Sequence, residues 1–118
     1  MDKAKRIYPI ADFVRPSDDK PIRSVVSSTD ESAVIVWHAN PGQEIAAHTH
    51  PNGQDTWTVI SGEADYYEGD GAVRRIKVGD IAIARPDQVH GAYNCGTIPF
   101  IFVSVVAPAN AGYAAAER

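Results

Sequence analysis

The chain has 118 residues, of which 44% are hydrophobic and 22% are charged, and its formal net charge is −4 at pH 7. This length and composition are typical of one soluble globular domain with a core of its own. The negative charge disfavours nucleic acid as a partner, because phosphate binding needs a basic surface. No apolar run approaches the roughly 20 residues that span a bilayer, so no membrane partner is expected.

The single cysteine, Cys95, excludes an internal disulfide and predicts a reducing, cytoplasmic location. Residues 1–6 are charged and no apolar segment follows them, which does not fit a secretory signal. The internal basic cluster of Arg74, Arg75 and Lys77 is interpreted as a solvated strand face rather than a binding patch.

Most of the chain shows the pattern of short strands. Residues 1–20 are the exception, because they are polar with scattered apolar anchors. From Ile22 onward, β-branched and aromatic runs alternate with Gly, Pro, Asn and Asp, which predicts an all-β sandwich or barrel. The expected strands are 22–28, 33–39, 44–50, 55–61, 63–68, 73–78, 81–85, 88–94 and 99–107.

Two of these segments, 33–37 and 100–103, are apolar at successive positions and are therefore expected to be covered on both faces. An antiparallel double-sheet jelly roll, with a partner subunit over one sheet, meets this demand. Residues 113–118 are rich in alanine and are expected to form a short helical turn at most.

The histidines carry the chemical signal. His48 and His50 lie in the run Gly42-x5-His48-x-His50-x4-Asp55-x6-Gly62. On a strand, residues two apart point to one face about 7 Å from each other, so both imidazoles can close on one ion. Imidazole and carboxylate ligands suit zinc, iron, nickel, manganese and copper, so this pattern predicts a metal site. The alternative is a pair of surface histidines near a turn.

A third histidine, His90, lies in the run Gly79-x10-His90-x3-Asn94. It is a candidate metal ligand, with a hydrogen-bonded core histidine as the alternative. Asn94 shares its strand face and is expected to hydrogen-bond the following turn. His38 lies outside both runs and is interpreted as a strand-end or rim residue rather than a ligand.

The two runs resemble the two motifs of the cupin family. The first cupin motif is Gly-x5-His-x-His-x3,4-Glu-x6-Gly, and the second is Gly-x5-Pro-x-Gly-x2-His-x3-Asn. The chain departs from them where Asp55 replaces the glutamate, where Pro86 is displaced by one position, and where Asp87 stands in place of the second glycine. Matching positions are Gly42, His48, His50, Gly62, Gly79, His90 and Asn94.

The resemblance implies an all-β, double-stranded β-helix, that is, a jelly-roll barrel, with one divalent transition metal inside it. The implied ligands are His48, His50, Asp55 and His90. Aspartate is one methylene shorter than glutamate, so both direct coordination by Asp55 and a role through water stay open. Trp57 shares the strand face of Asp55 and either packs in the core or lines a substrate pocket.

The resemblance also sets the expected organisation and function. We expect one cupin domain over residues 1–118, with an N-terminal arm (1–20), a barrel (about 22–107) and a C-terminal tail (108–118). The expected function is that of a metal-dependent enzyme acting on a small molecule, dioxygenase-like or isomerase/lyase-like, with a dioxygenase favoured. The alternative is a non-catalytic module that binds or senses a small molecule with the same metal. The arm and the doubly apolar strands predict a homodimer.

Overall fold

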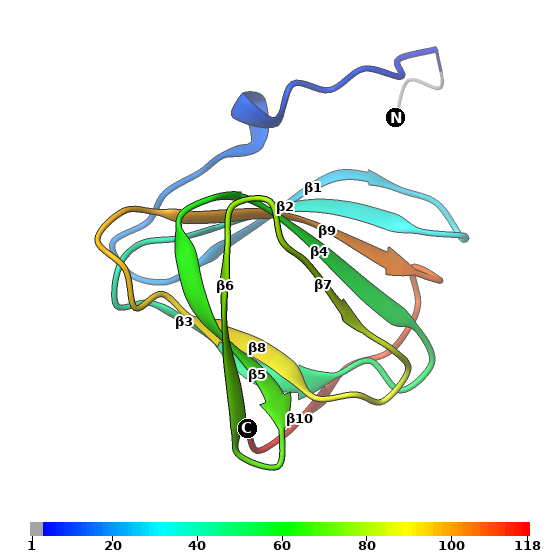
Figure 1. The fold of residues 1–118 in the computed structure, drawn as a ribbon. Helices are drawn as coiled ribbons and strands as arrows, with labels where there is room; N and C mark the ends of the chain where they lie inside the picture. Colours follow the sequence, from blue (N-terminus) through cyan, green and yellow to red (C-terminus); the bar gives the residue numbers. More distant parts are fainter. Residues whose placement is uncertain (1–3) are drawn as a thin grey trace.

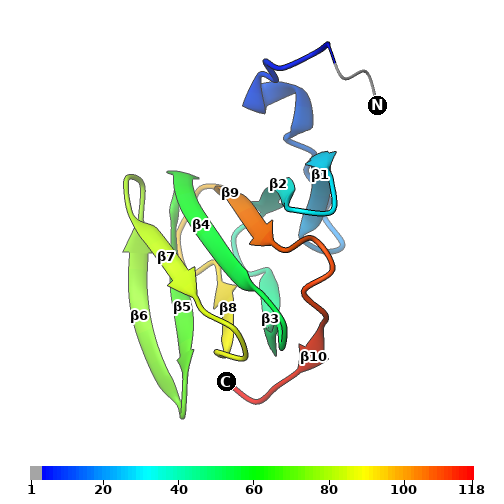
Figure 2. The same cartoon turned by 90° about the vertical axis from the view of Figure 1, so that its right-hand side faces the viewer.

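The structure is a computed structural model that describes residues 4–118 and is nearly all-β. Two antiparallel five-stranded sheets, in the orders β1-β2-β9-β4-β7 and β10-β3-β8-β5-β6, face each other as a jelly-roll barrel (Figures 1 and 2). The expected fold class, a double-stranded β-helix, is therefore confirmed.

All nine expected strands are present, and their ends differ from the expected ones by at most two residues. The first sheet contains β1 (Ile22–Ser28), β2 (Ala33–Ala39), β9 (Phe100–Ala107), β4 (Gln54–Ser61) and β7 (Ile81–Ala84). The second contains β10 (Ala114–Ala115), β3 (Glu44–Thr49), β8 (His90–Tyr93), β5 (Glu63–Gly69) and β6 (Ala72–Lys77).

The expectation of a helical turn over residues 113–118 is wrong. Ala114 and Ala115 form β10, which lies antiparallel to β3 opposite Thr49 and His48. The exposed edge of β3 offers unpaired backbone groups, and pairing with them outweighs the helix propensity of a short terminal run. The tail therefore lies along the strand that carries His48.

Cover on both faces is more extensive for β2, where only Val34 and Trp37 are half-buried, than for β9. In β2, Ile35 on one face and Val36 and His38 on the other are all buried. In β9, Ile101 and Val103 are only half-buried on the outward face. The N-terminal segment leaves the barrel beside β1 and carries the short 3₁₀ helix η1 (Ile10–Phe13), none of whose residues is buried (Figures 1 and 2).

The barrel interior is layered along β4. Asp55, Trp57 and Val59 alternate with half-buried or exposed residues and point inward. The Trp57 ring stacks on Phe102 of β9 at 3.9 Å between centroids, and both side chains are at most 1% exposed. This apolar layer packs next to Asp55, so the carboxylate lies beside a dry core.

The basic cluster on β6 is a solvated face, as expected, because each of its cations has an acidic partner on the surface. The pairs are Arg74 with Glu68 at 3.1 Å, Arg75 with Asp65 at 2.9 Å and Lys77 with Asp80 at 3.8 Å. Between residues 4 and 118, no helix has the length and apolar character that crossing a membrane requires.

Candidate metal centre

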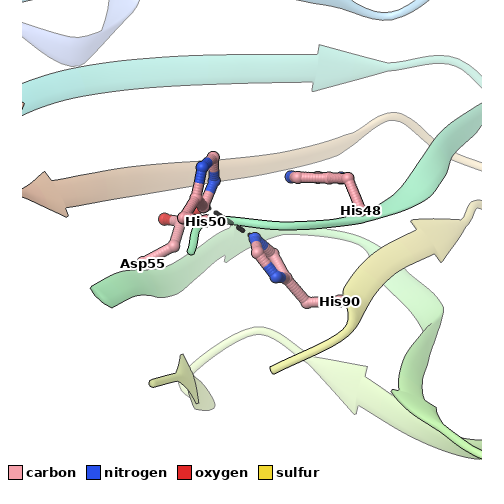
Figure 3. A group of neighbouring side chains, drawn as sticks. All are labelled: His48, His50, Asp55 and His90. Carbon is pink, nitrogen blue, oxygen red and sulfur yellow. Dashed lines mark hydrogen bonds and ion pairs between the residues drawn. The ribbon is translucent and has the colours of Figure 1, made fainter. Parts of the chain in front are cut away.

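Four side chains that are far apart in the sequence meet inside the barrel (Figure 3). His48 comes from β3, His50 follows that strand directly, Asp55 comes from β4 and His90 opens β8. One potential ligand atom from each residue lies within 4.8 Å of the corresponding atoms of the other three. The structure thus brings together all four residues that the sequence singled out, and their role as ligands stays a prediction.

The local backbone explains how His90 reaches the pair on β3. His48 lies directly opposite His90 in the β3–β8 ladder, next to an irregularity between Ile45 and His48. Gly91 allows the close approach, because a Cβ at this position would lie 2.7 Å from the Ile45 carbonyl oxygen. The His48 and His90 rings consequently have their centroids 4.2 Å apart.

Each imidazole is oriented by a backbone carbonyl that accepts a hydrogen bond from Nδ1. The donors and acceptors are His48 to Ala46 at 2.7 Å, His50 to Gly112 at 2.7 Å and His90 to Gln88 at 3.1 Å. A carbonyl can only accept, so Nδ1 carries a proton in all three rings. The three Nε2 atoms are therefore left for the centre of the group, as in proteins whose metal-binding histidines are held by outer hydrogen bonds.

The Asp55 carboxylate completes the group. Its Oδ1 accepts a hydrogen bond from the Ser104 hydroxyl at 2.5 Å, while Oδ2 lies 3.1 Å from His90 Nε2 and 3.3 Å from His50 Nε2. Two ligand atoms that are each about 2.1 Å from one ion lie about 3.0–3.4 Å apart at right or tetrahedral angles. The donor types and their spacing fit a divalent transition metal, and the shorter aspartate side chain does reach the group.

The electrostatics of the group favour a cation at its centre. Burial lowers the pKa of His48 to about 4, while the hydrogen bond to Asp55 raises the pKa of His50. Burial alone would raise the pKa of Asp55, but hydrogen bonds from His50, His90 and Ser104 outweigh it and hold that pKa well below its ordinary range. An ionised carboxylate facing imidazole nitrogens needs a positive charge between them, either a proton or a metal ion.

The group opens into a cavity of about 650 Å³, a size typical of small-molecule sites. Trp57 packs in the core and also lines this cavity, so the two roles that the sequence left as alternatives are both present. Tyr113 stacks on His48 with the ring centroids 5.1 Å apart. The tail thus forms one wall of the site.

Other residues named from the sequence lie outside the group. His38 is buried in β2, where desolvation lowers its pKa, and it does not join the cluster. Asn94 donates to the carbonyls of Ala39 and Ile98 and accepts from the Gly96 amide, so it holds the following turn as expected. Cys95 is half-buried and free.

Sequence reasoning missed several residues of this site. Ser104 is the one polar residue in the apolar run of β9, which is the signal that could have found it. Tyr113 and Gly112 lie in a tail without a recognisable strand pattern. Lys20 and Arg23 also line the cavity, and no sequence motif marks them.

The fold and the group define a class of protein: a small jelly-roll barrel with a largely buried His-His-Asp-His cluster, of which His48, His50 and Asp55 line a cavity. The cupin domain pattern matches residues 35–106, and the chain belongs to this family. The resemblance noted from the two motifs is thereby confirmed.

Solved structures agree with this assignment. A Klebsiella pneumoniae protein, described as an uncharacterized conserved protein with a double-stranded beta-helix domain, is 66% identical over 97% of this chain and 99% of its own, with a TM-score of 0.94. An RmlC-like cupin from Desulfovibrio desulfuricans is 21% identical over 89% of this chain and 98% of its own, with a TM-score of 0.79. A predicted oxalate decarboxylase from Thermotoga maritima is 19% identical over 80% and 97%, with a TM-score of 0.69. The latter two show the fold alone, and no protein with a curated description matches the chain.

Proposed function

We propose that the chain is a metal-dependent enzyme that binds one divalent transition metal through His48, His50, Asp55 and His90. The observation that supports this most is the convergence of the four donor groups, three of which (His48, His50 and Asp55) line a cavity large enough for a small-molecule substrate. Iron, zinc, nickel and manganese all suit this donor set. A bound ion would supply Lewis acidity, and iron would add reactivity toward dioxygen.

Within this proposal we favour a dioxygenase-type oxidoreductase. An isomerase or a lyase is the next candidate. Four protein ligands leave an ion with one or two further positions, and such positions suit dioxygen or a substrate oxygen. The chain's own residues have separate tasks: the backbone carbonyls orient the rings, Ser104 orients Asp55, and the stacked rings of Trp57 and Phe102 exclude water from one side.

Metal analysis followed by a turnover screen tests the proposal. Protein purified from its native host is assayed for bound metals, and the loaded protein is then screened with small acids, phenols and sugars in an oxygen electrode. Oxygen uptake that requires the metal and is lost in His90→Ala supports the oxygenase, and turnover without oxygen uptake supports the isomerase or lyase. Saturable binding with no turnover assigns the non-catalytic module instead.

The chain's organisation is part of the proposal. Residues 1–118 would form one cytoplasmic cupin domain, with the arm (1–20), the barrel (22–107) and the tail (108–118) as its parts. Ile7 in the arm is 81% exposed, and the arm extends away from its own barrel (Figure 1). A polar arm with exposed apolar anchors in that position suits packing against a second copy, so we include a homodimer in the proposal.

A further inference from the structure

The cavity beside the metal centre is lined by two cations that have no acidic partner. Lys20, just before β1, and Arg23, within β1, both face it. Between residues 4 and 118, neither forms an ion pair or a side-chain hydrogen bond, whereas the three cations of β6 all have carboxylate partners. Two unpaired cations beside a concave site are suited to hold an anion.

The strand register directs Arg23 toward the cavity. Arg23 lies directly opposite Trp37 in the β1–β2 ladder, so the two side chains share one sheet face. Cross-strand neighbours of this kind have Cβ atoms about 4.5–5.5 Å apart. Trp37 and Arg23 both line the cavity. The side chain of Arg23 therefore lies on the cavity side of the sheet, beside Trp37.

The remaining lining contains one further acid and many apolar residues. Glu44 is the acid of the lining outside the metal group, and its carboxylate already accepts a hydrogen bond from the Tyr67 hydroxyl. The formal charges of Lys20, Arg23, Glu44 and Asp55 cancel, so a bound divalent ion makes the cavity net positive. The larger apolar side chains of the lining are Ile35, Trp37, Ile45, Trp57, Val106 and Tyr113.

We propose that Lys20 and Arg23 form a carboxylate-binding subsite, and that the substrate is a small organic acid with a flat apolar body. The carboxylate binds the two cations, the body lies against the aromatic wall, and the other end of the molecule faces the metal group. That the bound acid is a substrate rests on the proposed enzymatic function. The binding of a carboxylate at Lys20 and Arg23 does not depend on turnover.

Calorimetry with a matched pair of probes tests the subsite. Benzoate and benzamide have nearly the same shape, and only benzoate is charged at pH 7. The metal-loaded protein is expected to bind benzoate about tenfold more tightly, the effect of one hydrogen-bonded charge pair. Arg23→Gln should remove most of this preference, Arg23→Lys should keep part of it, and metal content should be unchanged in both. Arg74→Gln, which removes an exposed cation that is not part of the cavity lining, is the control and should behave as the parent does.

Several results would overturn the subsite. The subsite is ruled out if the protein binds benzoate and benzamide equally, or if Arg23→Gln still prefers benzoate. A preference that survives in Arg23→Gln and disappears in metal-free protein would assign the anion to the metal. Phenyl phosphate binding more tightly than benzoate, with the same loss in Arg23→Gln, would replace the carboxylate by a phosphate. If the preference depends on Arg23 in metal-free protein and no turnover is found, the subsite stands and the enzymatic function fails.

Discussion

Ser104 of β9 donates a hydrogen bond of 2.5 Å to Oδ1 of Asp55 on the neighbouring strand β4, and this contact turns Oδ2 toward His50 and His90. The two residues lie diagonally across the ladder, since Ser104 is opposite Trp57 and Asp55 is opposite Val106. The orientation of the carboxylate is therefore set by a residue 49 positions later in the chain.

Replacing this hydroxyl should weaken metal binding without unfolding the barrel. We expect Ser104→Ala to lower metal affinity about 10- to 100-fold, because Asp55 loses the partner that orients it. Ser24→Ala is the matched control, since the Ser24 hydroxyl is also buried but has no hydrogen-bond partner in the described part of the chain. Metal titration of both variants provides the measurement, and equal affinities would show that Ser104 does not position the carboxylate.

The histidines should separate into ligands and a structural residue. We expect His48→Ala, His50→Ala and His90→Ala each to lose nearly all bound metal, because each removes one direct bond. His38→Ala should keep the metal but lower the melting temperature, since His38 is buried in β2 outside the group. Metal content after identical loading and desalting decides this, and full occupancy in any of the first three variants would contradict the ligand assignment.

Metal affinity should decrease as the pH falls from about 8 to 5. The hydrogen bond to Asp55 raises the pKa of His50 above the ordinary value of 6.5. A proton therefore begins to compete with the metal for that ring at a pH above 6.5, and the competition grows as the pH falls. Displacing one proton costs about tenfold in affinity per pH unit. His48, with a pKa of about 4, stays neutral over this range and adds no competition.

Competition titrations at several pH values measure this dependence. Asp55→Asn serves as the comparison, because without the carboxylate the pKa of His50 is no longer raised and the decrease should begin at lower pH. An affinity that does not change with pH would argue against histidine ligation.

The sequence predicted the ligand group better than it predicted the surroundings. His48 and His50 could be assigned to one strand face from the period of two, and His90 could be added from the spacing of the second motif. Both are local features of the sequence, and the barrel brings the two motifs together. Ser104 could not be assigned, because its role depends on the β4–β9 register. The tail could not be assigned either, because Ala114 and Ala115 have no strand pattern of their own and pair only with the edge of β3.

The turn before β8 shows how a departure from the cupin motif is accommodated. Asp87 stands where the motif has glycine, and its φ of 65° lies in the left-handed region that aspartate tolerates. We expect Asp87→Gly to change the free energy of unfolding by less than about 1 kcal/mol, since lost strain and gained chain entropy offset each other.

Gly62→Ala should cost much more stability than Asp87→Gly. Gly62 has a φ of 75°, and an added Cβ would lie 2.4 Å from the Pro99 carbonyl oxygen. We expect a loss of about 2 kcal/mol or more, as strain and a clash combine. Urea denaturation of both variants tests the pair, and similar changes in the free energy of unfolding would show that the close approach of Pro99 to Gly62 adds no cost.

The homodimer should be visible in light scattering at micromolar concentration. Ile7 is 81% exposed and Ile10 is 36% exposed in the single chain, and contact with a second copy would bury them. We expect a dimer mass for the parent and a shift toward monomer for the double variant Ile7→Glu, Ile10→Glu. A monomer mass for the parent would rule out the dimer, and an unchanged dimer in the variant would place the interface elsewhere.

The carbonyl of Gly112 holds the His50 ring at 2.7 Å, and Tyr113 covers His48. Gly112 and Tyr113 are thus part of the candidate metal centre, whereas the described N-terminal segment extends away from the barrel (Figure 1). Purification tags therefore belong on the N-terminal side, since a fusion after residue 118 would load the segment whose Gly112 carbonyl orients His50 and whose Tyr113 ring stacks on His48. By the same reasoning, a preparation trimmed by a carboxypeptidase past Tyr113 would hold a different site from the intact chain.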